Sequence, residues 1–508
     1  MIHELDDLRE GFDIECDAVV IGSGAGGAVA AANLARAGLR TVVIEAGPRV
    51  RPRDMTRDGP EFLSKYYWEG GLRMLTGSGA FPSMAGRCLG GSTVVNSAIM
   101  FQLPEWVRRI WIDEDNLQAL ASDDFDAAFQ RVFKRTKVGP TPWDAMGTRN
   151  RISYEIMQEA GLDAKPLPRA VDGCKGSGDC LTGCASGAKQ SVDRSYLPHA
   201  LNDGAEVYTC SVATRILTDG SGAIGVEGDI VDPDGRRKIA RWKVSAPKVF
   251  VAAGSTHTPV LLLRSGITAG GRVGATFEAH ISSYAVGVMD EPVEPWVGAT
   301  QGVGAFSDKV QGMKFESLWA STSLIAAQWG GLGSDFYNLL PDLRRAATIA
   351  LVYRAKVTGS VRARRNGLPD ARLWIPKEEH WVVLAELKRV VDAMLRRGAE
   401  YVYTGIHGVP SFIRTHEDAE ALLSKKIRPR HVTMTANHTF GSCRMSDDPR
   451  KGVVDQQGRV NGVDGLWLCD ASIFPSPSAV NPQATVMALS DLISRRVGEL
   501  SAGPEATE

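Results

Sequence analysis

The chain of 508 residues is 44% hydrophobic and 23% charged, and its 58 basic and 59 acidic side chains leave a net charge of −1. Such a length exceeds what one hydrophobic core usually supports, so we expect two domains or one large composite fold. The balanced charge gives no electrostatic argument for nucleic acid or an anionic membrane surface as a partner.

The N-terminal segment MIHELDDLREGFDIECD is acidic and lacks the apolar stretch of a secretory signal. No run approaches the roughly 18 apolar residues of a membrane-spanning helix. The arginine-rich stretch 343–365 could seek a membrane, but we interpret it as a strand with a solvated basic edge. We therefore expect a soluble, cytoplasmic protein without a transmembrane segment. Its eight cysteines are too few for a disulfide scaffold at this length.

A nucleotide-binding pattern begins the chain. Residues 17–22, DAVVIG, form a short apolar run typical of a buried parallel strand. The loop GSGAGG follows, then a helix of small residues closed by Gly38, and then RTVVIE, a second strand that ends at Glu45. Strand, loop, helix and terminal acid together predict a dinucleotide site. The candidate cofactor-binding residues here are Gly22, Gly24, Ala25, Gly26, Gly27, Glu45 and Ala46.

Each part of this pattern has a physical task. Gly22 permits the tight turn, Gly24 lets the backbone approach a pyrophosphate, and Gly27 lets helix and strand pack closely. The N-terminus of the helix then offers unpaired N–H groups to the phosphates. Glu45 lies 18 positions after Gly27, where its carboxylate can accept the ribose hydroxyls of an adenosine. The spacing alone does not separate FAD from NAD.

The second half of the nucleotide fold lies far downstream. Residues 248–266 predict a strand, a glycine turn and a helix, and residues 464–475 predict another buried strand that ends at Asp470. The nucleotide domain is therefore interrupted by other segments. Residues 378–403 have helical periodicity up to Gly398 and predict a scaffold helix, while the tail 501–508 looks disordered.

Several separated motifs, taken together, resemble the glucose–methanol–choline (GMC) family of FAD oxidoreductases. They occur in the order GSGAGG with Glu45, GRCLGGSTVVNSA, NHTFGSCRM, GRVNGVDGLWLCDASIFP and VNPQATVMAL. Residues 179–200 are similar to the long-chain alcohol oxidase and related bacterial dehydrogenase branches. Three positions depart from the usual motif after its histidine, namely Thr439, Ser442 and Ser446.

The resemblance implies an α/β fold in which an interrupted Rossmann-like FAD-binding domain carries an inserted antiparallel-sheet substrate domain. We expect residues 1–118, 195–275 and 436–508 to form the FAD-binding domain. Residues 119–194 and 276–435 would form the substrate-binding domain.

The resemblance also implies further cofactor-binding residues. Gly90, Gly91, Ser92 and Asn96 would wrap the flavin pyrophosphate and ring, and Val212 would meet adenine. The remaining positions carried over are Ala253, Asp470, Ala471, Pro482 and Gln483. Some members attach FAD covalently through a histidine in the GGS segment; that position is Val95 here, so we expect non-covalent FAD.

His438 and Asn481, 43 positions apart, match the family's active-site pair. Oxidation of an alcohol removes a proton from oxygen and a hydride from carbon; flavin N5 can accept the hydride, and an imidazole suits the proton. The Asn481 amide could hold the substrate oxygen. Asn481 also reads as the N-cap of a helix starting at Pro482, with its positive end toward the flavin. The alternatives are a core histidine and a purely structural cap; His257, His280 and His407 receive no role.

Cys174, Cys180 and Cys184 form a C-x5-C-x3-C array. Thiolates at such spacing could hold an iron–sulfur cluster. The loop also resembles that of bacterial FAD-dependent glucose dehydrogenases, in which three cysteines hold a three-iron cluster that passes electrons to a cytochrome subunit. The alternative is a loop of reduced cysteines over the flavin. Zinc is disfavoured because the nearest candidate fourth ligand, His199, is 15 positions on.

The sequence thus predicts FAD-dependent oxidation of an alcohol to an aldehyde or ketone by hydride transfer to flavin N5. The apolar stretch 315–333, with Trp319 and Trp329, is a candidate pocket wall, and the alternative is an ordinary sheet or helix core. The apolar bias and the similarity to the long-chain alcohol oxidase branch favour a bulky or lipophilic alcohol over a sugar. The alternatives are a sugar dehydrogenase with an iron–sulfur relay, a non-redox flavin lyase or decarboxylase, and a binding protein with a vestigial site. Oxygen, a quinone and a cytochrome all remain open as the electron acceptor.

Overall fold

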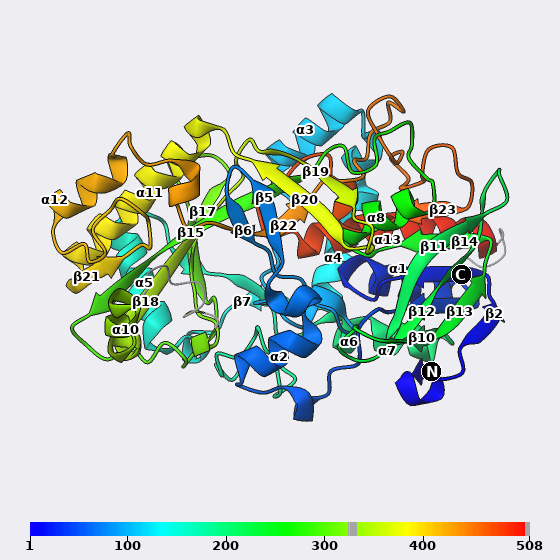
Figure 1. Cartoon of the computed structure of the whole chain (residues 1–508), viewed down its shortest axis with the longest axis horizontal. Coiled ribbons are helices and arrows are strands. Elements are labelled where there is room, and N and C mark those ends of the chain that lie inside the picture. Colours follow the sequence, from blue (N-terminus) through cyan, green and yellow to red (C-terminus); the bar gives the residue numbers. More distant parts are fainter. Residues whose placement is uncertain (324, 326–332, 503–508) are drawn as a thin grey trace.

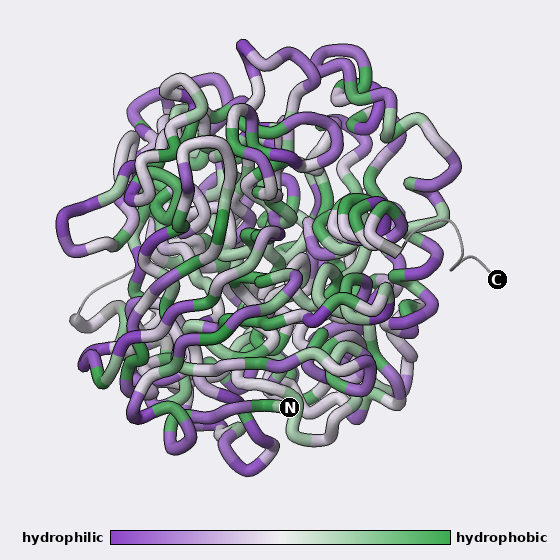
Figure 2. Tube along the Cα trace, turned by 90° about the vertical axis from the view of Figure 1, so that its right-hand side faces the viewer, coloured by the Kyte–Doolittle hydropathy of each residue, from purple (hydrophilic) through white to green (hydrophobic). Residues whose placement is uncertain are grey.

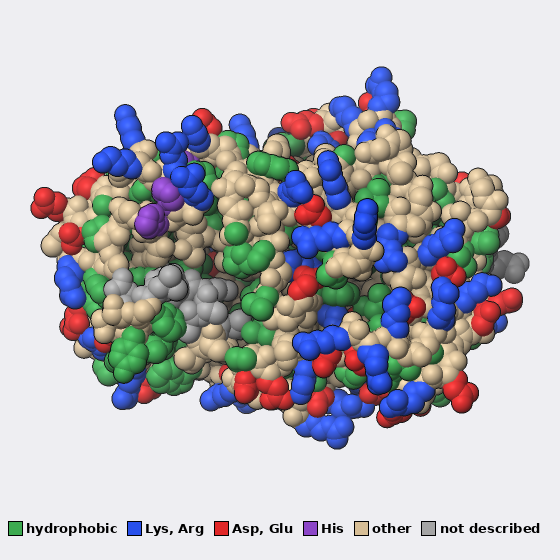
Figure 3. All heavy atoms as spheres, viewed as in Figure 1, with side chains coloured by type: hydrophobic (Ala, Val, Ile, Leu, Met, Phe, Trp, Pro, Cys, Tyr) green, Lys and Arg blue, Asp and Glu red, His purple; other side chains and the backbone are tan. Residues whose placement is uncertain are grey.

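The structure, a computed structural model, describes residues 1–323, 325 and 333–502. Figure 1 shows an elongated molecule with the nucleotide-binding pattern on the right and a large antiparallel sheet on the left. At right angles to this view, apolar segments gather in the interior and hydrophilic segments on the outside (Figure 2). Positive and negative side chains are interspersed on the face shown in Figure 3.

A six-stranded parallel sheet forms the centre of the right-hand part. Its inner strands are short runs of buried Val, Ile, Ala and Phe, as expected of a parallel sheet covered on both faces. In spatial order the strands are β1 (Ile2–His3), β10 (Glu206–Tyr208), β4 (Thr41–Ile44), β3 (Ala18–Ile21), β14 (Lys248–Val251) and β23 (Leu466–Leu468). Strands from both ends of the chain lie together here, which confirms the interrupted Rossmann-like fold.

Helices α1 (Ala25–Arg36) and α13 (Gln483–Ala502) pack against each other beside this sheet. The small residues of α1 allow the close approach, because its alanines from Ala28 to Ala35 are almost fully buried. Nearby helices are α3 (Glu105–Asp115), α4 (Asp123–Arg135), α6 (Val192–Ser195), α7 (Leu197–Asn202) and α8 (His257–Arg264). A second sheet joins β11 (Ser211–Thr218), β12 (Ala223–Val231), β13 (Lys238–Ser245) and β2 (Phe12–Glu15).

The left-hand part is built on a seven-stranded antiparallel sheet. The strands are β21 (Ala399–Tyr403), β15 (Glu278–Met289), β18 (Ala346–Tyr353), β17 (Met313–Ser317), β16 (Val303–Phe306) and β8 (Lys165–Pro166), with β22 (Thr435–Phe440) paired to β15. Helices α5 (Gly147–Glu159) and α11 (Lys377–Arg396) cover it, and their apolar faces share one hydrophobic core with the strands. This sheet is the antiparallel unit that the resemblance implied.

The remaining elements are smaller. A four-stranded sheet joins β19 (Thr358–Ala363), β20 (Pro369–Trp374), β5 (Met74–Gly77) and β6 (Ala80–Pro82), and a two-stranded one joins β7 (Val138–Pro140) and β9 (Pro168–Ala170). Short helices are α2 (Gly59–Tyr66), α10 (Ser334–Leu339) and α12 (His416–Ala419). The exact domain limits stay a prediction.

Individual predictions can now be compared with these elements. The stretch 343–365 contains two strands: β18 is fully buried between Arg345 and Arg354, and β19 carries the exposed Arg362. The helix predicted to end near Gly398 is α11. Trp319 is buried in an apolar cluster with Tyr284 and Tyr401, whereas Trp329 lies outside the described residues. Within 1–323 and 333–502, no helix is both long and apolar enough to cross a membrane.

Candidate active site

Four groups of the predicted cofactor-binding residues lie where strands of the parallel sheet end. The glycine loop follows β3, Glu45 follows β4, Ala253 follows β14, and Asp470 follows β23. In open parallel sheets, ligands bind at the carboxyl ends of strands, where the chain turns away. The four strand ends therefore form one edge around which a nucleotide can bind.

In the glycine loop, the backbone of the first turn of α1 lies directly against the backbone of neighbouring segments. Gly22 has φ of 94° and its N–H donates to the carbonyl of Ile44 at 2.8 Å. A Cβ atom on Gly27 would lie 1.8 Å from the carbonyl oxygen of Gly22, and one on Gly26 would lie 1.7 Å from that of Cys469. These glycines allow the start of α1 to approach β3 and the end of β23.

Gly24 faces free space instead. The nearest heavy atom to a Cβ placed on Gly24 would be the Cα of Gly91, 4.0 Å away. Gly90 and Gly91 both have positive φ and bring the GGS loop to this point, while Ser92 accepts a hydrogen bond from the N–H of Gly86 at 3.0 Å. Gly24 thus leaves the backbone uncovered between two glycine-rich loops at the first turn of α1, as the approach of a pyrophosphate would require.

Glu45 is buried, and burial raises the pKa of its carboxyl group. One carboxylate oxygen accepts bonds from the Ser23 hydroxyl at 2.6 Å and the Ser23 N–H at 3.0 Å; the other accepts from Gly47 N–H at 2.8 Å. The N–H of Gly90 donates to the Ser23 hydroxyl at 2.9 Å. Ser23, which the sequence did not single out, thus connects Glu45 to the GGS loop.

Two further residues take neighbouring positions. The half-buried Val212 lies in β11, and the preceding N–H, of Ser211, donates to the backbone carbonyl of Glu45 at 2.8 Å. Ala46, also half-buried, directly follows Glu45, and its carbonyl accepts a bond from Arg87 at 3.3 Å. The adenosine-binding roles of Glu45 and Val212 stay predictions.

Asp470 holds together the loop after β14, the start of α8 and the turn that follows β23. Its carboxylate accepts from the N–H of Gly254 at 2.8 Å, the hydroxyl of Thr258 at 2.5 Å and the N–H of Ser472 at 2.7 Å, while burial raises its pKa. Thr258 lies in the first turn of α8, so Asp470 fixes the turn that contains Ala253 and Gly254. The Ala471 carbonyl accepts from Gly441 N–H at 3.1 Å, which brings the histidine motif to this edge.

Two of the motif departures make hydrogen bonds at this junction. The Thr439 hydroxyl is 2.6 Å from that of Ser255, and the Ser442 hydroxyl donates to the Ser255 carbonyl at 2.6 Å. Ser255 lies in the loop between β14 and α8. Both substituted residues therefore fasten the motif to the nucleotide-binding part.

Helix α13 begins at Gln483, one residue later than predicted. The Pro482 carbonyl accepts the first helical bond, from Val486 N–H at 2.9 Å, so Pro482 is the N-cap. The prediction that Asn481 caps this helix was wrong. The Gln483 side chain instead accepts from the Asn96 amide at 2.6 Å, which connects the GGS segment to the helix.

His438 lies in β22 directly opposite His280 in β15. The two Nδ1 atoms are 3.2 Å apart and the rings are nearly perpendicular, at 82°. His280 is buried, and its Nε2 has no hydrogen-bond partner within the described part of the chain. Because an Nδ1–Nδ1 contact holds one hydrogen, only one of the two rings carries its proton on Nδ1.

His438 is half-buried, and its pKa is lowered to about 4. Burial is the largest cause, the positive charge of Lys314 adds to it, and Glu316 opposes it. The imidazole is therefore neutral throughout the physiological range. A neutral imidazole can accept a proton.

Lys314 and Glu316 are functional candidates that the sequence did not reveal. Both are buried on β17, and the Lys314 ammonium donates to the Glu316 carboxylate and to the Asn481 amide oxygen. The other carboxylate oxygen of Glu316 accepts from the Gln301 amide at 2.7 Å. The spacing K-x-E on a strand, which places both charges on one face, was the available signal.

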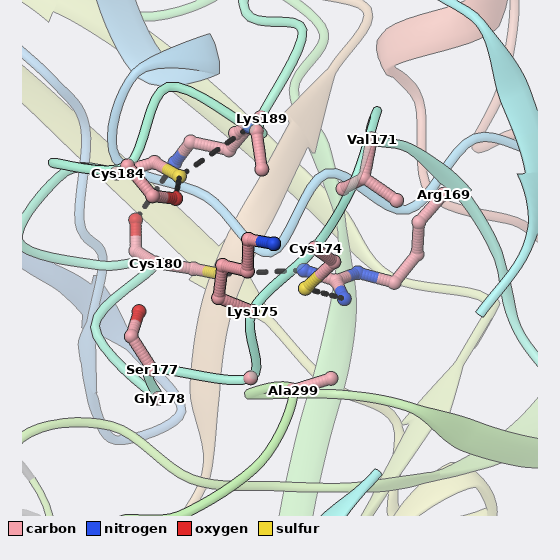
Figure 4. Close-up of a pocket in the computed structure, with 13 residues that line it drawn as sticks. Arg169, Val171, Cys174, Lys175, Ser177, Gly178, Cys180, Cys184, Lys189 and Ala299 are labelled. Carbon is pink, nitrogen blue, oxygen red and sulfur yellow. Dashed lines mark hydrogen bonds between the residues drawn. The ribbon is translucent and has the colours of Figure 1, made fainter. Parts of the chain in front are cut away.

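The three-cysteine segment is shown in Figure 4. Arg169 donates to Cys174 Sγ at 3.8 Å and to Cys180 Sγ at 3.2 Å, while Cys184 Sγ accepts from the N–H of Lys189 at 3.4 Å. Burial opposes ionisation of Cys180, but Arg169, Lys189 and Thr300 together outweigh it and lower its pKa. The Lys189 ammonium also donates to the Asn96 carbonyl at 2.8 Å, so this segment supports the GGS loop.

This arrangement does not fit an iron–sulfur cluster. Arg169 occupies two of the sulfur atoms and the Lys189 N–H the third, and the cavity that the segment lines has a volume of about 10 Å³, the room of roughly one water molecule. Among the residues that the structure describes, no three or more His, Cys, Asp or Glu side chains are placed to hold a metal ion. The geometry favours the alternative, a loop of free cysteines.

Comparisons with known proteins place this site in a family. The GMC oxidoreductase models match residues 63–282 and 355–490, and a model of an FAD binding domain matches residues 17–53. An uncharacterised GMC-type oxidoreductase of Mycobacterium tuberculosis is 33% identical over 475 residues, covering 93% of this chain and 74% of that protein. A long-chain-alcohol oxidase of Arabidopsis thaliana is 30% identical over 530 residues, with 97% and 68% covered. The crystal structure of pyridoxine 4-oxidase from Mesorbium loti has the same fold, with a TM-score of 0.69, 18% identity, and 95% of this chain and 99% of that chain covered.

Proposed function

The chain belongs to the GMC oxidoreductase family, an FAD-binding oxidoreductase family, and we propose that it oxidises an alcohol to an aldehyde or ketone. One observation carries the proposal. A neutral, half-buried imidazole, that of His438, lies on a strand whose continuation is bonded to Ala471 at the nucleotide-binding edge. Bound FAD supplies an acceptor for the hydride that leaves the carbinol carbon.

His438 acts as the base. With its proton on Nδ1, donated to Nδ1 of His280, the Nε2 of His438 keeps a free lone pair for the hydroxyl proton of the alcohol. When His438 takes that proton it becomes an imidazolium, and its Nδ1–H bond to a neutral acceptor becomes charge-assisted and stronger. His280 thereby holds the ring in the tautomer that the reaction needs, in the way that the second group of a catalytic triad does.

Asn481 positions the alcohol. Its amide oxygen is occupied by Lys314, so its amide N–H groups are free to donate to the substrate oxygen. Such a bond directs the carbinol carbon and strengthens as negative charge develops on oxygen. Asn481 and His438 thus divide the work: the amide holds the oxygen, and the imidazole removes its proton.

We infer a bulky or lipophilic alcohol as the substrate. The long-chain-alcohol oxidase of Arabidopsis thaliana supports this class, as does the similarity of residues 179–200 to that branch. The sugar-dehydrogenase alternative needs an iron–sulfur relay, which the three-cysteine segment does not fit. Oxygen, a quinone and a cytochrome are all candidate acceptors.

Anaerobic mixing with alcohols tests the function directly. We expect 1-decanol or a sterol to bleach the 450 nm flavin band in the dark faster than ethanol or glucose does, because the site is proposed to take a lipophilic alcohol. Admission of air then distinguishes an oxidase, which recovers its colour within seconds, from a dehydrogenase, which does not. A flavin that no alcohol bleaches would favour the lyase, decarboxylase or vestigial-site alternatives.

The bound FAD should be non-covalent. Val95 occupies the position at which some relatives carry the linking histidine, and its buried aliphatic side chain has no nucleophilic atom for a bond to the flavin. Precipitation with trichloroacetic acid should therefore leave the yellow colour in the supernatant, as measured by absorbance at 450 nm. A yellow pellet would contradict this expectation.

A further inference from the structure

The ammonium group of Lys314 is enclosed by the protein. Lys314 is 1% exposed, and its Nζ lies 5.4 Å from the centre of the Phe101 ring. Its two hydrogen bonds run to the Glu316 carboxylate and to the Asn481 amide oxygen. A buried cation is costly unless it is paired and hydrogen-bonded, so this geometry is strongly determined.

Glu316 supplies the pairing and is itself held in place. It is 2% exposed, two positions along β17 from Lys314, and Gln301 donates to its second oxygen at 2.7 Å. Burial lowers the pKa of Lys314, while the charge of Glu316 and its hydrogen bond oppose this shift. The ammonium group is consequently anchored from the side of the antiparallel sheet.

The hydrogen bond to Asn481 connects the Lys314 ammonium group to the segment just before α13. A primary amide has two orientations of similar shape, with oxygen and nitrogen exchanged. An ammonium group cannot accept a hydrogen bond, so it selects the orientation with the oxygen toward Lys314. Among residues 1–323 and 333–502, the Asn481 amide nitrogen has no acceptor, and its two N–H groups are available for a ligand.

We propose that Lys314 is a positioning residue that acts through Asn481, fixing the amide so that its N–H groups face the substrate oxygen. The inference rests on the proposed function, in which Asn481 holds the alcohol. Lys314 also faces His438, whose neutral form its charge favours. The experiment must therefore separate an effect through the amide from an effect through the imidazole.

A double-mutant cycle makes this separation. Lys314→Met should slow anaerobic flavin reduction by 1-decanol, or by the fastest alcohol of the screen, roughly 10- to 100-fold, because a freely rotating amide loses its alignment. In an Asn481→Ala background the same change should alter the rate by less than about two-fold, since residues that act as one unit are not additive. Lys314→Arg, which keeps a cationic donor, should recover most of the rate.

The controls exclude general damage. Lys388→Met removes a paired lysine from α11, distant in sequence and outside the proposed site, and should leave the reduction rate unchanged. FAD content and Tm are measured for every variant. If Lys314→Met yields no folded protein, Lys314→Gln replaces it in the same cycle with the same criterion.

The outcomes separate this inference from the function it rests on. Equal slowing in both backgrounds, or an arginine variant as slow as the methionine one, would overturn the positioning role while leaving Asn481 in the reaction. A loss that disappears at higher pH would assign the effect of Lys314 to the imidazole and would also overturn it. If Asn481→Ala alone leaves the rate unchanged, Asn481 has no role in the reaction. In that case the proposed function of Asn481 is wrong, and the positioning role of Lys314 fails with it.

Discussion

His438→Ala should slow anaerobic flavin reduction by alcohol roughly 10²–10⁴-fold, the range that a general base contributes. The side chain lies opposite His280 on paired strands, so its removal takes away the proton acceptor without breaking the β15–β22 ladder. FAD should stay bound, with an unchanged flavin spectrum. Stopped-flow absorbance at 450 nm measures the rate.

His407→Ala is the matched control, because His407 is exposed and stacks edge-on against His431, outside the proposed site. It should reduce flavin at the normal rate. His438→Asn should resemble the alanine variant, because an amide cannot take up the proton. Normal reduction in both His438 variants would remove this residue from the mechanism.

The pH dependence gives a second measure of the same group. The pKa of His438 is lowered to about 4, chiefly by burial, so the base is already neutral at pH 5. The rate limb due to His438 should therefore lie near pH 4 and not near 6.5. The stability of the fold should also fall at low pH. Between about pH 6.5 and 4, His438 takes up a proton in the unfolded chain but not in the folded chain, so the free energy of unfolding decreases as the pH falls through that range.

Two alanine substitutions in the glycine loop should have different effects, one on the stability of the fold and the other on FAD binding. Gly27→Ala places a Cβ 1.8 Å from a backbone oxygen, which no side-chain movement can relieve. We expect the free energy of unfolding to fall by about 3 kcal/mol or more, the upper end for overpacking. The variant should be poorly soluble or colourless, with a markedly lower Tm.

Gly24→Ala should fold normally and still lose FAD. The added methyl group meets no protein atom closer than 4.0 Å, but it occupies the space assigned to the pyrophosphate. A penalty of about 1–3 kcal/mol in the complex corresponds to roughly 5- to 150-fold weaker FAD binding. Flavin fluorescence titration of the apoprotein measures this affinity, and the Tm of the apoprotein should equal that of the wild-type apoprotein.

Gly139→Ala provides the control for both variants, because Gly139 lies in β7 and a Cβ there meets nothing within 4 Å. It should change neither Tm nor FAD affinity. If Gly24→Ala lowers the stability of the apoprotein as much as Gly27→Ala does, the opening beside Gly24 is not a ligand site.

Local patterns explain which features the sequence could predict. The strand, glycine turn, helix and acid of the dinucleotide motif lie within residues 17–45, so periodicity and spacing suffice to identify them. The terminal helix was predicted to within one residue of its start, but the role of Asn481 as its cap was not correct. A boundary of one residue decides whether an amide caps a helix or turns toward another strand.

Long-range pairing explains what the sequence concealed. His280 lies 158 positions from His438, and Lys314 lies 167 positions from Asn481. Only the register of β15 with β22, and the place of β17 in the same sheet, bring these side chains together. A buried strand carrying K-x-E at alternate positions indicates a charged pair on one face, but it does not name the residue that the pair contacts.

Hydrogen bonds connect strand β22 to the antiparallel sheet and the residues just after it to the nucleotide-binding edge. The strand pairs with β15 from Thr435 to Phe440, and the chain beyond it bonds through Gly441 and Cys443 to residues 471 and 472. A hinge motion that moved the two parts of the molecule apart would have to break these hydrogen bonds. His438, the proposed base, should therefore keep its position relative to the nucleotide-binding edge. Substrate and product would then have to enter and leave by movements of neighbouring side chains and loops rather than by separation of the two parts.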